Sequence, residues 1–546
     1  MDAHSLSFTS ASQRTSSRIW KDLTSCRLQS TLARNSGEML DQPTLVNKIG
    51  KRRAEIYHRK PHVAVIGAGL AGLRCADILL HHGFQVTLIE GRTRLGGRVH
   101  QETLPSGHIV DAGPNWIHGT NDNPILDLAK ETETAIGSWD NRTYVLDENG
   151  KLLSLAESER HSSIMWGIIE DAFRHSNKHC ATISPSESLW DFFQNEVARR
   201  IPDTKPDFER ERDMVFKIAE SWGAFVGSHI FTQSLKYFWL EECIEGENLF
   251  CAGTYKKILE RIAKPALEGA VIRYETVVAS IQSSSDDGGQ LKVLTRGGES
   301  FEFDEVVVTA PLGWLKQHHT EAFSPPLPAR LTKAIENIGY GSLEKVYISF
   351  PEAFWLTSDS KERKVQGFCQ WLAPNYAPES NPHKWNQEMV ELASLTPETS
   401  HPTLLFYTYG DQSRYLTGEL VRLPTKEKRE AFLYAWFRPY YSRLPRYEEG
   451  ASACKPTGCF ATAWLADELA GNGSYSNFQV GLEEGDADIE TMREGLPDCG
   501  LWLAGEHTAP FVALGTATGA YWSGESVASR IAKAYCREEG GITVLN

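Results

Sequence analysis

The clearest pattern of apolar and polar positions lies between residues 62 and 90. A short apolar run, VAVIG at 63–67, predicts a buried strand that leads into a glycine-rich loop. Apolar positions over 70–82 then recur at helical spacing, and QVTLIE at 85–90 predicts a second strand. The pattern therefore predicts a strand, a loop, a helix and a strand, the unit that places two parallel strands side by side.

In the middle of the chain the pattern changes from helical to strand-like. Helical spacing predicts helices over 164–181, 187–199 and 206–226. Strand-like stretches separated by turn residues follow at 271–282, 290–300 and 301–315. The last stretch contains EVVVTAP, which is apolar enough to be buried on both faces, so we expect it to return to the parallel sheet.

The end of the chain repeats the strand-then-helix pattern. Residues 316–460 first mix strand-like stretches with aromatic-rich loops. A buried strand is then predicted within GLWLAGEHT at 500–508. Helical spacing over 515–535 predicts a helix of about five turns. Sheet-forming stretches thus occur in well-separated parts of the chain, which predicts a domain that is discontinuous in sequence.

The length of the chain agrees with more than one domain, since 546 residues exceed the roughly 250–300 at which a single core stops growing. We predict an α/β protein in which a discontinuous Rossmann-type dinucleotide-binding domain is interrupted twice by an α+β substrate-binding domain. The first domain takes residues 61–125, 250–315 and 461–535, the second takes 126–249 and 316–460, and the ends are an N-terminal extension at 1–60 and a tail at 536–546.

The composition argues against several kinds of partner. The chain is 41% hydrophobic, and no uninterrupted apolar run reaches the roughly 18–20 residues of a membrane-spanning helix, so we expect no membrane partner. A formal net charge of −15 at pH 7 argues against nucleic acid, whose binding requires basic patches. The 10 cysteines contain no CxxC pair, which indicates neither a disulfide framework nor a zinc site and suits a reducing compartment.

The N-terminal extension, residues 1–60, is rich in Ser, Thr and Arg and contains few acids. This composition is compatible with a mitochondrial presequence, but a disordered tail is the simpler interpretation. We therefore expect a cytoplasmic protein, with mitochondrial targeting as the alternative. The sequence leaves the oligomeric state open.

Candidate chemistry begins with three glycines at GxGxxG spacing, Gly67, Gly69 and Gly72. In this motif the first glycine permits a tight turn, the second lets the backbone approach a pyrophosphate, and the third lets the helix pack on the strand. The phosphates then lie at a helix N-terminus. Glu90 ends the second strand, where its carboxylate can accept both ribose hydroxyls of an adenosine. This context favours a dinucleotide site over an ordinary turn.

The residues after Glu90 distinguish between dinucleotides. EGRTRLGGR places Gly96 and Gly97 where the backbone can press against a second ligand segment, with Arg98 positioned to pair with a phosphate. Arg92 or Arg94 could bind the 2′-phosphate of NADP, but Glu90 would repel that group.

With this series, GxGxxG, an acidic residue and RxGGR, the sequence resembles the flavin-containing amine oxidase family. The resemblance covers about residues 62–532 and extends over further blocks in order, at 110–129, 335–350, 461–481 and 501–528. It implies a glutathione-reductase-like FAD-binding domain and FAD as the cofactor. It also implies the activity: a C–N bond of an amine loses hydride to the flavin, the imine hydrolyses to an aldehyde and an amine, and O2 becomes H2O2.

The resemblance also implies which residues lie on the flavin ring. In VDAGPNWIHG, a Gly-x-x-Trp loop containing Asn115 and Trp116 lies against the flavin. Trp464 lies beside the ring. Lys345, in GSLEKVYISF, holds a water against flavin N5. Without the resemblance, Lys345 would be an edge-strand lysine in solvent, because a lysine in a buried strand has to be paired.

Other matching positions contact the rest of the cofactor. By resemblance, Glu506 hydrogen-bonds the ribityl or pyrophosphate region, and the backbone of Val278 meets the adenine. The helix that begins near Ala517, after Thr516, points its N-terminus at the N1/C2=O edge, where its dipole favours the reduced ring. The alternative interpretation of Val278 and Trp464 is simple core packing, and that of Glu506 is a helix-capping acid.

On the substrate side, Tyr475 matches one aromatic wall of the cage that guides an amine to the flavin. Thr516 stands where some members have the second wall, and Ser474 stands where members with covalent flavin have a cysteine, so we expect non-covalent FAD. His118 resembles the histidine of polyamine and spermine oxidases, although a structural loop histidine is equally compatible. Of the acids in EECIEGENLF, the sequence does not tell which faces the substrate: Glu241, Glu242, Glu245 and Glu247.

These features predict a polyamine-type amine oxidase whose small-molecule partners are the amine and O2. Three alternatives remain. An L-amino-acid oxidase would need an arginine for the carboxylate, and Arg438 or Arg443 could serve. A specialised-metabolite amine oxidase would explain Thr516, and a flavin-binding scaffold without activity is the non-enzymatic alternative. Histone demethylases resemble the chain less, since no sustained heptad run supplies their coiled-coil insertion.

Overall fold

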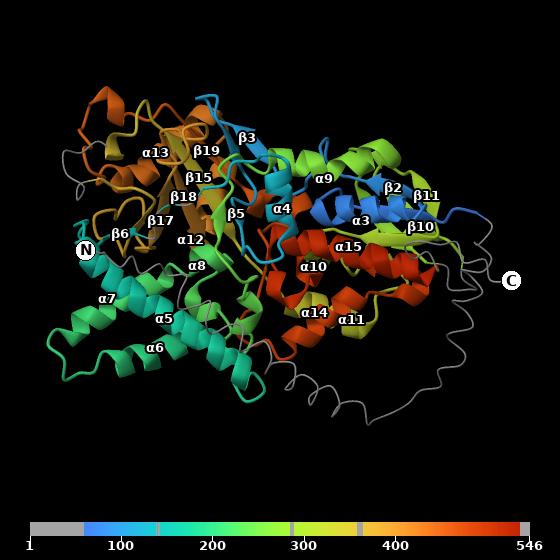
Figure 1. The fold of residues 1–546 in the computed structure, drawn as a ribbon, viewed down its shortest axis with the longest axis horizontal. Helices are drawn as coiled ribbons and strands as arrows, with labels where there is room; N and C mark the ends of the chain where they lie inside the picture. The colour runs from blue at the N-terminus through green and yellow to red at the C-terminus, as the bar shows by residue number, and fades with distance from the viewer. Residues whose placement is uncertain (1–58, 138, 140–141, 284–288, 357–363, 536–546) are drawn as a thin grey trace, which may run out of the picture.

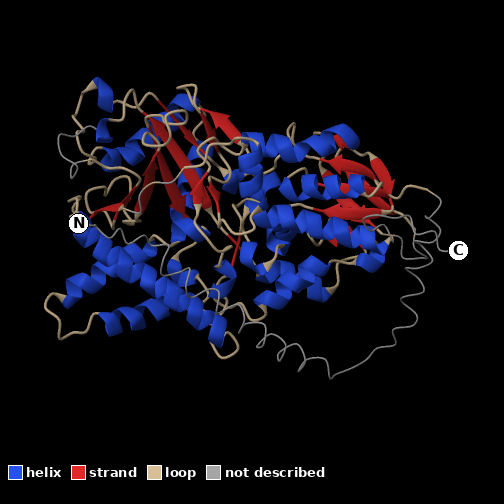
Figure 2. Ribbon diagram, in the orientation of Figure 1, coloured by secondary structure: helices blue, strands red, loops and turns tan. Residues whose placement is uncertain are grey.

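The computed structural model describes residues 59–137, 139, 142–283, 289–356 and 364–535. Nearly all of the predicted N-terminal extension and the whole predicted tail lie outside these residues. Two β-rich regions lie side by side, each flanked by helices (Figure 2). The structure is therefore of the mixed α/β class that the sequence predicts, and the domain boundaries stay a prediction.

The first β-rich region is a five-stranded parallel sheet. The predicted unit is present: β1 (His62–Ile66), α3 (Leu70–His81) and β2 (Gln85–Ile89), with β1 and β2 paired in parallel. The strand order is β21-β12-β1-β2-β8. The other three strands come from distant parts of the chain: β8 (Val271–Arg273), β12 (Glu305–Val308) and β21 (Leu501–Leu503). The expected return of EVVV to this sheet is confirmed, since all four residues of β12 are buried.

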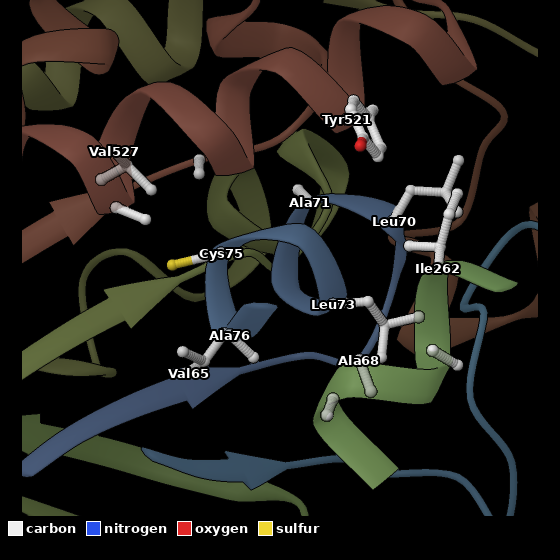
Figure 3. Packing of buried hydrophobic residues seen from close by; sticks show 14 of the residues in the cluster. Val65, Ala68, Leu70, Ala71, Leu73, Cys75, Ala76, Ile262, Tyr521 and Val527 are labelled. Carbon is white, nitrogen blue, oxygen red and sulfur yellow. The ribbon is translucent and has the colours of Figure 1, made fainter. Parts of the chain in front are cut away.

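Two helices clamp α3 against this sheet (Figure 3). The predicted C-terminal helix is α15 (Ala517–Ala534), and the other is α9 (Lys256–Gly269). Helix α15 crosses α3 so closely that a Cβ on Gly524 would lie 2.1 Å from the carbonyl oxygen of Ala71. On the other side Leu73 and Ile262 belong to the same buried cluster. This packing fixes the first turn of α3, and with it the glycine loop.

A smaller four-stranded sheet is inserted in sequence between strands of the parallel one, since β9 to β11 lie between β8 and β12. Its order is β11-β10-β9-β13, and β9 to β11 are antiparallel neighbours. The bounds are β9 (Val278–Gln282), β10 (Leu291–Thr295), β11 (Ser300–Phe303) and β13 (Phe323–Ser324). The strand-like stretches predicted over 271–303 are thus confirmed.

The second β-rich region is a six-stranded sheet of order β19-β15-β18-β17-β16-β6. Strand β15 pairs with β18 on one side and with β19 on the other, so it is an interior strand. The bounds are β6 (Thr143–Leu146), β15 (Leu343–Ser349), β16 (Phe368–Trp371), β17 (Gln387–Glu391), β18 (Thr403–Tyr409) and β19 (Gly458–Ala461).

The helices beside this sheet were only partly predicted. The predicted helices over 164–226 correspond to α5 (Leu155–His179), α6 (Leu189–Arg200), α7 (Phe208–Glu220) and α8 (Gly223–Val226) (Figure 1). Helices α12 (Gly410–Arg422) and α13 (Lys426–Tyr441) replace part of the expected strands and loops. Aromatic residues are common in strands, and proline is rare inside helices. The aromatic residues and Pro439, in the last turn of α13, therefore made the helical pattern hard to recognise.

Short elements complete the fold. They are α4 (Pro124–Glu131), α10 (Leu312–His318), α11 (Ala329–Asn337) and α14 (Gly485–Glu494), and the two-stranded ribbons β3 (Gln101–Thr103) with β4 (Ile109–Asp111), β5 (Trp116–Ile117) with β7 (Leu249–Phe250), and β14 (Gly339–Tyr340) with β20 (Ser476–Asn477). Within the described ranges, no helix is both long and apolar enough to span a membrane.

Candidate cofactor and active site

The glycine loop has the geometry that its spacing predicts. Gly67 has a φ of +102°, which a side chain would disfavour. A Cβ on Gly72 would lie 2.0 Å from the carbonyl oxygen of Gly67, so this position must be glycine for the helix to pack on the loop. Gly69 caps the N-terminus of α3 without any side-chain hydrogen bond to the first turn. The first turn therefore offers backbone N–H groups to an anion.

Glu90 joins the glycine loop to the chain that follows β2. Its carboxylate is buried and accepts hydrogen bonds from the backbone N–H groups of Ala68 and Arg92, each at 2.8 Å. Each carboxylate oxygen has a second lone pair that a ribose hydroxyl can use. Val278 lies at the same end of the site, because Thr276, two residues before it, donates its N–H to the carbonyl of Glu90.

The two glycine-rich loops face each other across a narrow space. A Cβ on Gly69 would have no heavy atom closer than 4.0 Å, the carbonyl oxygen of Gly96, and a Cβ on Gly97 would lie 3.4 Å from the Cα of Gly69. Side chains at these two positions would fill the space without clashing with the fold. The residues present therefore fit an extended phosphate-containing group between the loops.

Three arginines follow Glu90, and the first two are bound close to the glycine loops. Arg92 is paired with Asp467 at 2.9 Å. Arg94 donates to the carbonyl of Gly97 at 2.9 Å and so braces the second glycine loop. Both arginines thus have partners inside the protein, and Glu90 lies directly after β2.

Arg98 connects the second glycine loop to two later blocks of the sequence. Its Nη1 donates to the carboxylate of Glu506 at 3.0 Å and to the carbonyl of Ser474 at 2.6 Å. Burial favours a higher pKa for Glu506, but Arg98, His507 and Ser476 outweigh it and hold the pKa below its ordinary value. Glu506 is therefore a carboxylate in an ion pair and not a helix cap.

A three-residue segment, Asp111 to Gly113, is the meeting point of side chains from distant strands. The hydroxyl of Tyr347 donates to the carbonyl of Asp111 at 2.8 Å, and the indole of Trp464 donates to that of Ala112 at 3.2 Å. The Nζ of Lys345 donates to the carbonyl of Gly113. Three consecutive carbonyls thus accept from three side chains, which fixes Lys345 and Trp464 side by side.

Lys345 occupies the centre of β15 and is only 6% exposed. The interpretation as an edge-strand lysine in solvent is therefore wrong. Burial lowers the pKa of Lys345, and the negative charges of Asp111 and Glu344 oppose that shift. A buried amine of this kind can release or hold a proton near neutral pH.

The Asn115–Trp116 loop is held by the hydroxyls of Tyr347 and Tyr407. The amide of Asn115 donates to the hydroxyl of Tyr347 at 3.1 Å, and the indole of Trp116 donates to that of Tyr407 at 3.2 Å. The Trp116 ring stacks on Phe368 with centroids 5.8 Å apart. Both predicted residues therefore lie on the wall formed by the six-stranded sheet.

His118 lies where the β5 loop approaches α15. Its carbonyl accepts from the amide of Asn123, whose oxygen in turn accepts from the hydroxyl of Thr518 in the first turn of α15. Burial lowers the pKa of His118, while a hydrogen bond with Asn248 opposes that shift. The imidazole is therefore neutral at pH 7 and can accept or donate one hydrogen bond.

Tyr475 lies beside the N-terminus of α15 and close to one of the four acids. A Cβ on Gly515 would lie 3.4 Å from the Tyr475 ring, and the Tyr475 hydroxyl donates to the carbonyl of Phe225 at 2.7 Å. Glu241 accepts from the N–H of Phe478, three residues after Tyr475, at 3.2 Å. Burial raises the pKa of Glu241 to about 7. The next acid, Glu242, has a more exposed side chain that accepts from Asn177, and burial raises its pKa as well.

Thr516 and Ser474 both use their hydroxyl groups internally. Thr516 is the N-cap of α15, where its hydroxyl accepts a hydrogen bond from the N–H of Gly519 at 2.9 Å. Ala517 follows it as the first residue of the helix. Ser474 accepts from the N–H of Leu343 at 3.2 Å. Thr516 is therefore an N-cap, the role that its residue type favours.

The sequence interpretation missed the residues that build the supporting network. These residues form hydrogen bonds with the predicted site residues or with the segments that carry them. They are Asp111, Tyr255, Tyr347, Tyr407, Glu344 and Thr462. A signal existed for both acids: Glu344 lies in an otherwise apolar strand beside Lys345, and Asp111 directly precedes the predicted Gly-x-x-Trp loop. The tyrosines carry no local signal, since a tyrosine in a strand is usual.

Comparison with known proteins gives a consistent result. The family model described as flavin containing amine oxidoreductase matches residues 70–532. Probable polyamine oxidase 4 of Arabidopsis thaliana is 26% identical over 500 residues, which cover 88% of this chain and 89% of that protein. Lysine-specific histone demethylase 1B homolog of Caenorhabditis elegans is 25% identical over 506 residues, which cover 88% of this chain but 57% of that protein. The chain thus spans little more than half the length of that demethylase relative.

Proposed function

Because this chain belongs to the flavin-containing amine oxidoreductase family, we propose that it is an FAD-dependent oxidase of a polyamine or a related amine. It would convert a C–N bond to an imine, which hydrolyses to an aldehyde and an amine, with O2 reduced to H2O2. The observation that carries the proposal is the buried Lys345, held beside Trp464 on the Asp111–Gly113 segment. Burying an ammonium in an interior strand costs free energy, so its presence there favours a functional role.

The parallel sheet would act as a glutathione-reductase-like Rossmann domain that holds FAD without a covalent bond. Glu90 would bind the adenosine ribose, and the loops of Gly69 and Gly97 would enclose the pyrophosphate. The first turn of α15, led by Ala517, would face the electron-rich edge of the ring. When bound, FAD would supply the chemistry by accepting a hydride from the carbon next to the amine nitrogen and passing the electrons to O2.

The side chains on the other wall would prepare the amine for that transfer. Lys345 Nζ would hold a water and its proton close to the reacting centre. Tyr475 and the tryptophans would exclude bulk water, and an amine in such an apolar setting loses its proton more easily. His118, as a neutral imidazole, would accept a hydrogen bond from the amine and orient it.

The acidic residue beside Tyr475 supports a substrate with more than one positive charge. Glu241 accepts a hydrogen bond from the N–H of Phe478, which places it beside the Tyr475–Phe478 segment. A carboxylate there would bind an ammonium group of a polyamine that is not being oxidised. The relative named probable polyamine oxidase 4, which the chain matches over nearly its full length, agrees with this choice.

The two arginines that could bind a substrate carboxylate in an amino-acid oxidase have partners within the protein. Arg438 pairs with Glu449 at 2.7 Å, and Arg443 lies over the ring of Tyr376. Both belong to the end of α13 and the turn after it, and both have partners there. A specialised-metabolite amine stays the second candidate, because the N-cap Thr516 leaves the cage with one aromatic wall.

The test is anaerobic mixing of the purified yellow protein with spermine, spermidine, their N-acetyl forms, a monoamine, an L-amino acid and a dimethyl-lysine peptide. Rapid bleaching of the flavin by a polyamine and by none of the others is the expected result. Bleaching by the peptide alone would instead match the relatives named as histone demethylases. We also propose that the protein acts in the cytoplasm without nucleic acid or membrane, which fractionation of cells expressing it would test.

A further inference from the structure

Asp111 is a buried acid whose role the proposed chemistry does not assign. It ends β4 and is 2% exposed. Its carboxylate accepts from the side-chain amide of Gln101 at 2.7 Å and from the backbone N–H of Tyr255 at 3.1 Å. Both donors are neutral. A carboxylate held in this way costs free energy unless a positive charge lies close by.

The backbone register places that positive charge on the facing strand. Residues 345 and 347 project from the same face of β15, because side chains alternate along a strand. Tyr347 donates to the carbonyl of Asp111 and Lys345 to that of Gly113. Asp111 therefore lies over the face of β15 that carries Lys345, and the Asp111–Gly113 segment runs along both side chains.

The second acid near Lys345 points to the other side of the strand. Glu344 precedes Lys345, so its side chain lies on the opposite face. Its carboxylate accepts from the hydroxyl of Thr462 and from the N–H of Leu465 at 2.9 Å. Glu344 thus supports the loop that carries Trp464, and Asp111 is the carboxylate on the lysine's own face.

The other titratable groups around Asp111 carry no charge at neutral pH. Tyr255 and Cys251 approach from the α9 side, Tyr347 from β15 and Tyr407 from β18, and burial raises the pKa of each of them. Burial also raises the pKa of Asp111 and lowers that of Lys345, while each charge opposes the shift of the other. The two groups are therefore the charged pair of this region and titrate together.

We propose that Asp111 is a positioning residue for Lys345: its carboxylate keeps the buried lysine charged and held to the Gly113 carbonyl, next to Trp464. The role of Lys345 in oxidation rests on the proposed function, but the pairing of the two residues does not. Without Asp111 the lysine would lose the carboxylate on its own face of β15, so its pKa would fall and it would release its proton more easily. The charge-assisted hydrogen bond that fixes Nζ would then weaken to a neutral one.

The test measures the protonation of Lys345 directly and needs no substrate. The protein is prepared with 13Cε-labelled lysine, and the Lys345 resonance is identified by its loss in Lys345→Met. In Asp111→Asn, this resonance is expected to titrate at a pH lower by about 1 or more than in the unmodified protein. Glu344→Gln is the matched control, because it removes a neighbouring buried carboxylate from the other face, and a smaller change is expected there.

Equal titration of Lys345 in Asp111→Asn and in the unmodified protein would overturn the proposal, as would a larger effect from Glu344→Gln. If Asp111→Asn does not fold, the double variant Asp111→Asn, Lys345→Met is expected to yield soluble protein, because the unpaired ammonium is then gone. Failure of the double variant as well would count against the pair. If the pair is found but no amine bleaches the flavin, the proposed function alone is wrong.

Discussion

Lys345 and Trp464 donate hydrogen bonds to adjacent carbonyls of one segment, Lys345 to Gly113 and Trp464 to Ala112. The two donors are 119 positions apart in the chain and lie on β15 and on the loop after β19. Strands β15 and β19 pair directly, and Thr462 donates its N–H to the carbonyl of Lys345 at 2.9 Å. The sheet therefore sets the spacing of the amine and the indole before any ligand is bound.

Replacing Lys345 by methionine keeps the length of the side chain and removes its proton. We expect the rate of flavin reduction or of reoxidation by O2 to fall by about 100-fold or more, as for loss of a proton-handling group, while FAD stays bound. Stopped-flow absorbance of the two half-reactions measures this. Lys292→Met, at an exposed position of β10, is the control. Unchanged rates in both half-reactions would remove the role given to Lys345.

A substitution at Gly69 is expected to weaken cofactor binding without unfolding the protein. Its φ is −76° and a Cβ there would meet nothing within 4.0 Å except one carbonyl oxygen, so Gly69→Ala is expected to cost at most about 1 kcal/mol of unfolding free energy. The methyl group would enter the space between the glycine loops. We therefore expect the dissociation constant of FAD to rise at least about tenfold, measured by flavin fluorescence.

Two other glycines provide the comparison. A Cβ on Gly72 would lie 2.0 Å from the Gly67 carbonyl oxygen, so Gly72→Ala is expected to lose stability as well as FAD. Gly418, in α12, has nothing within 4 Å, and Gly418→Ala is expected to keep both. If Gly69→Ala binds FAD as tightly as Gly418→Ala does, the cofactor does not pass between these loops.

The βαβ unit around α3 could be predicted because its information is local. The apolar run of β1, the helical spacing of α3 and the glycines between them lie within about thirty residues. Each of these patterns indicates its own element without reference to the rest of the chain. The return of β12 to the same sheet was also readable, because a strand buried on both faces is apolar throughout.

The supporting network could not be read in the same way. Tyr347 reaches Asp111 across 236 positions and Lys345 reaches Gly113 across 232, and nothing in either local sequence states the partner. Helix α13 was missed because its many aromatic residues, which favour strands, are all buried or half-buried and follow no clear helical period. Local patterns determine elements, whereas the contacts that position Lys345 arise only once β15 lies against the 111–113 segment.

The hydroxyl of Ser474 predicts how the flavin is held. An alcohol that accepts from the Leu343 N–H has neither the nucleophilic sulfur nor the freedom to form a thioether. We expect acid precipitation of the yellow protein to release all of its flavin into the supernatant as FAD, measured by absorbance and mass spectrometry. Flavin that stays with the precipitated chain, at any residue, would contradict non-covalent binding.

Glu241 gives the last prediction, a pH dependence of substrate affinity. Burial raises the pKa of Glu241 from 4.5 to about 7. The folded protein therefore binds a proton at Glu241 between these two pH values, so its contribution favours folding at low pH and is lost as pH rises through about 7. A neutral carboxyl attracts an ammonium weakly and a carboxylate strongly, so KM for a polyamine is expected to fall as pH rises from 6 to 8.

The matched pair of variants isolates this effect. Glu241→Gln is expected to raise KM about 10-fold to 100-fold at pH 8 and to make it independent of pH over this range, because one charge-assisted hydrogen bond is lost. Glu242→Gln, one position later and exposed, is expected to behave like the unmodified protein. Since polyamines stay fully charged between pH 6 and 8, a pH dependence that persists in Glu241→Gln belongs to another group, and His118 would be the next to test.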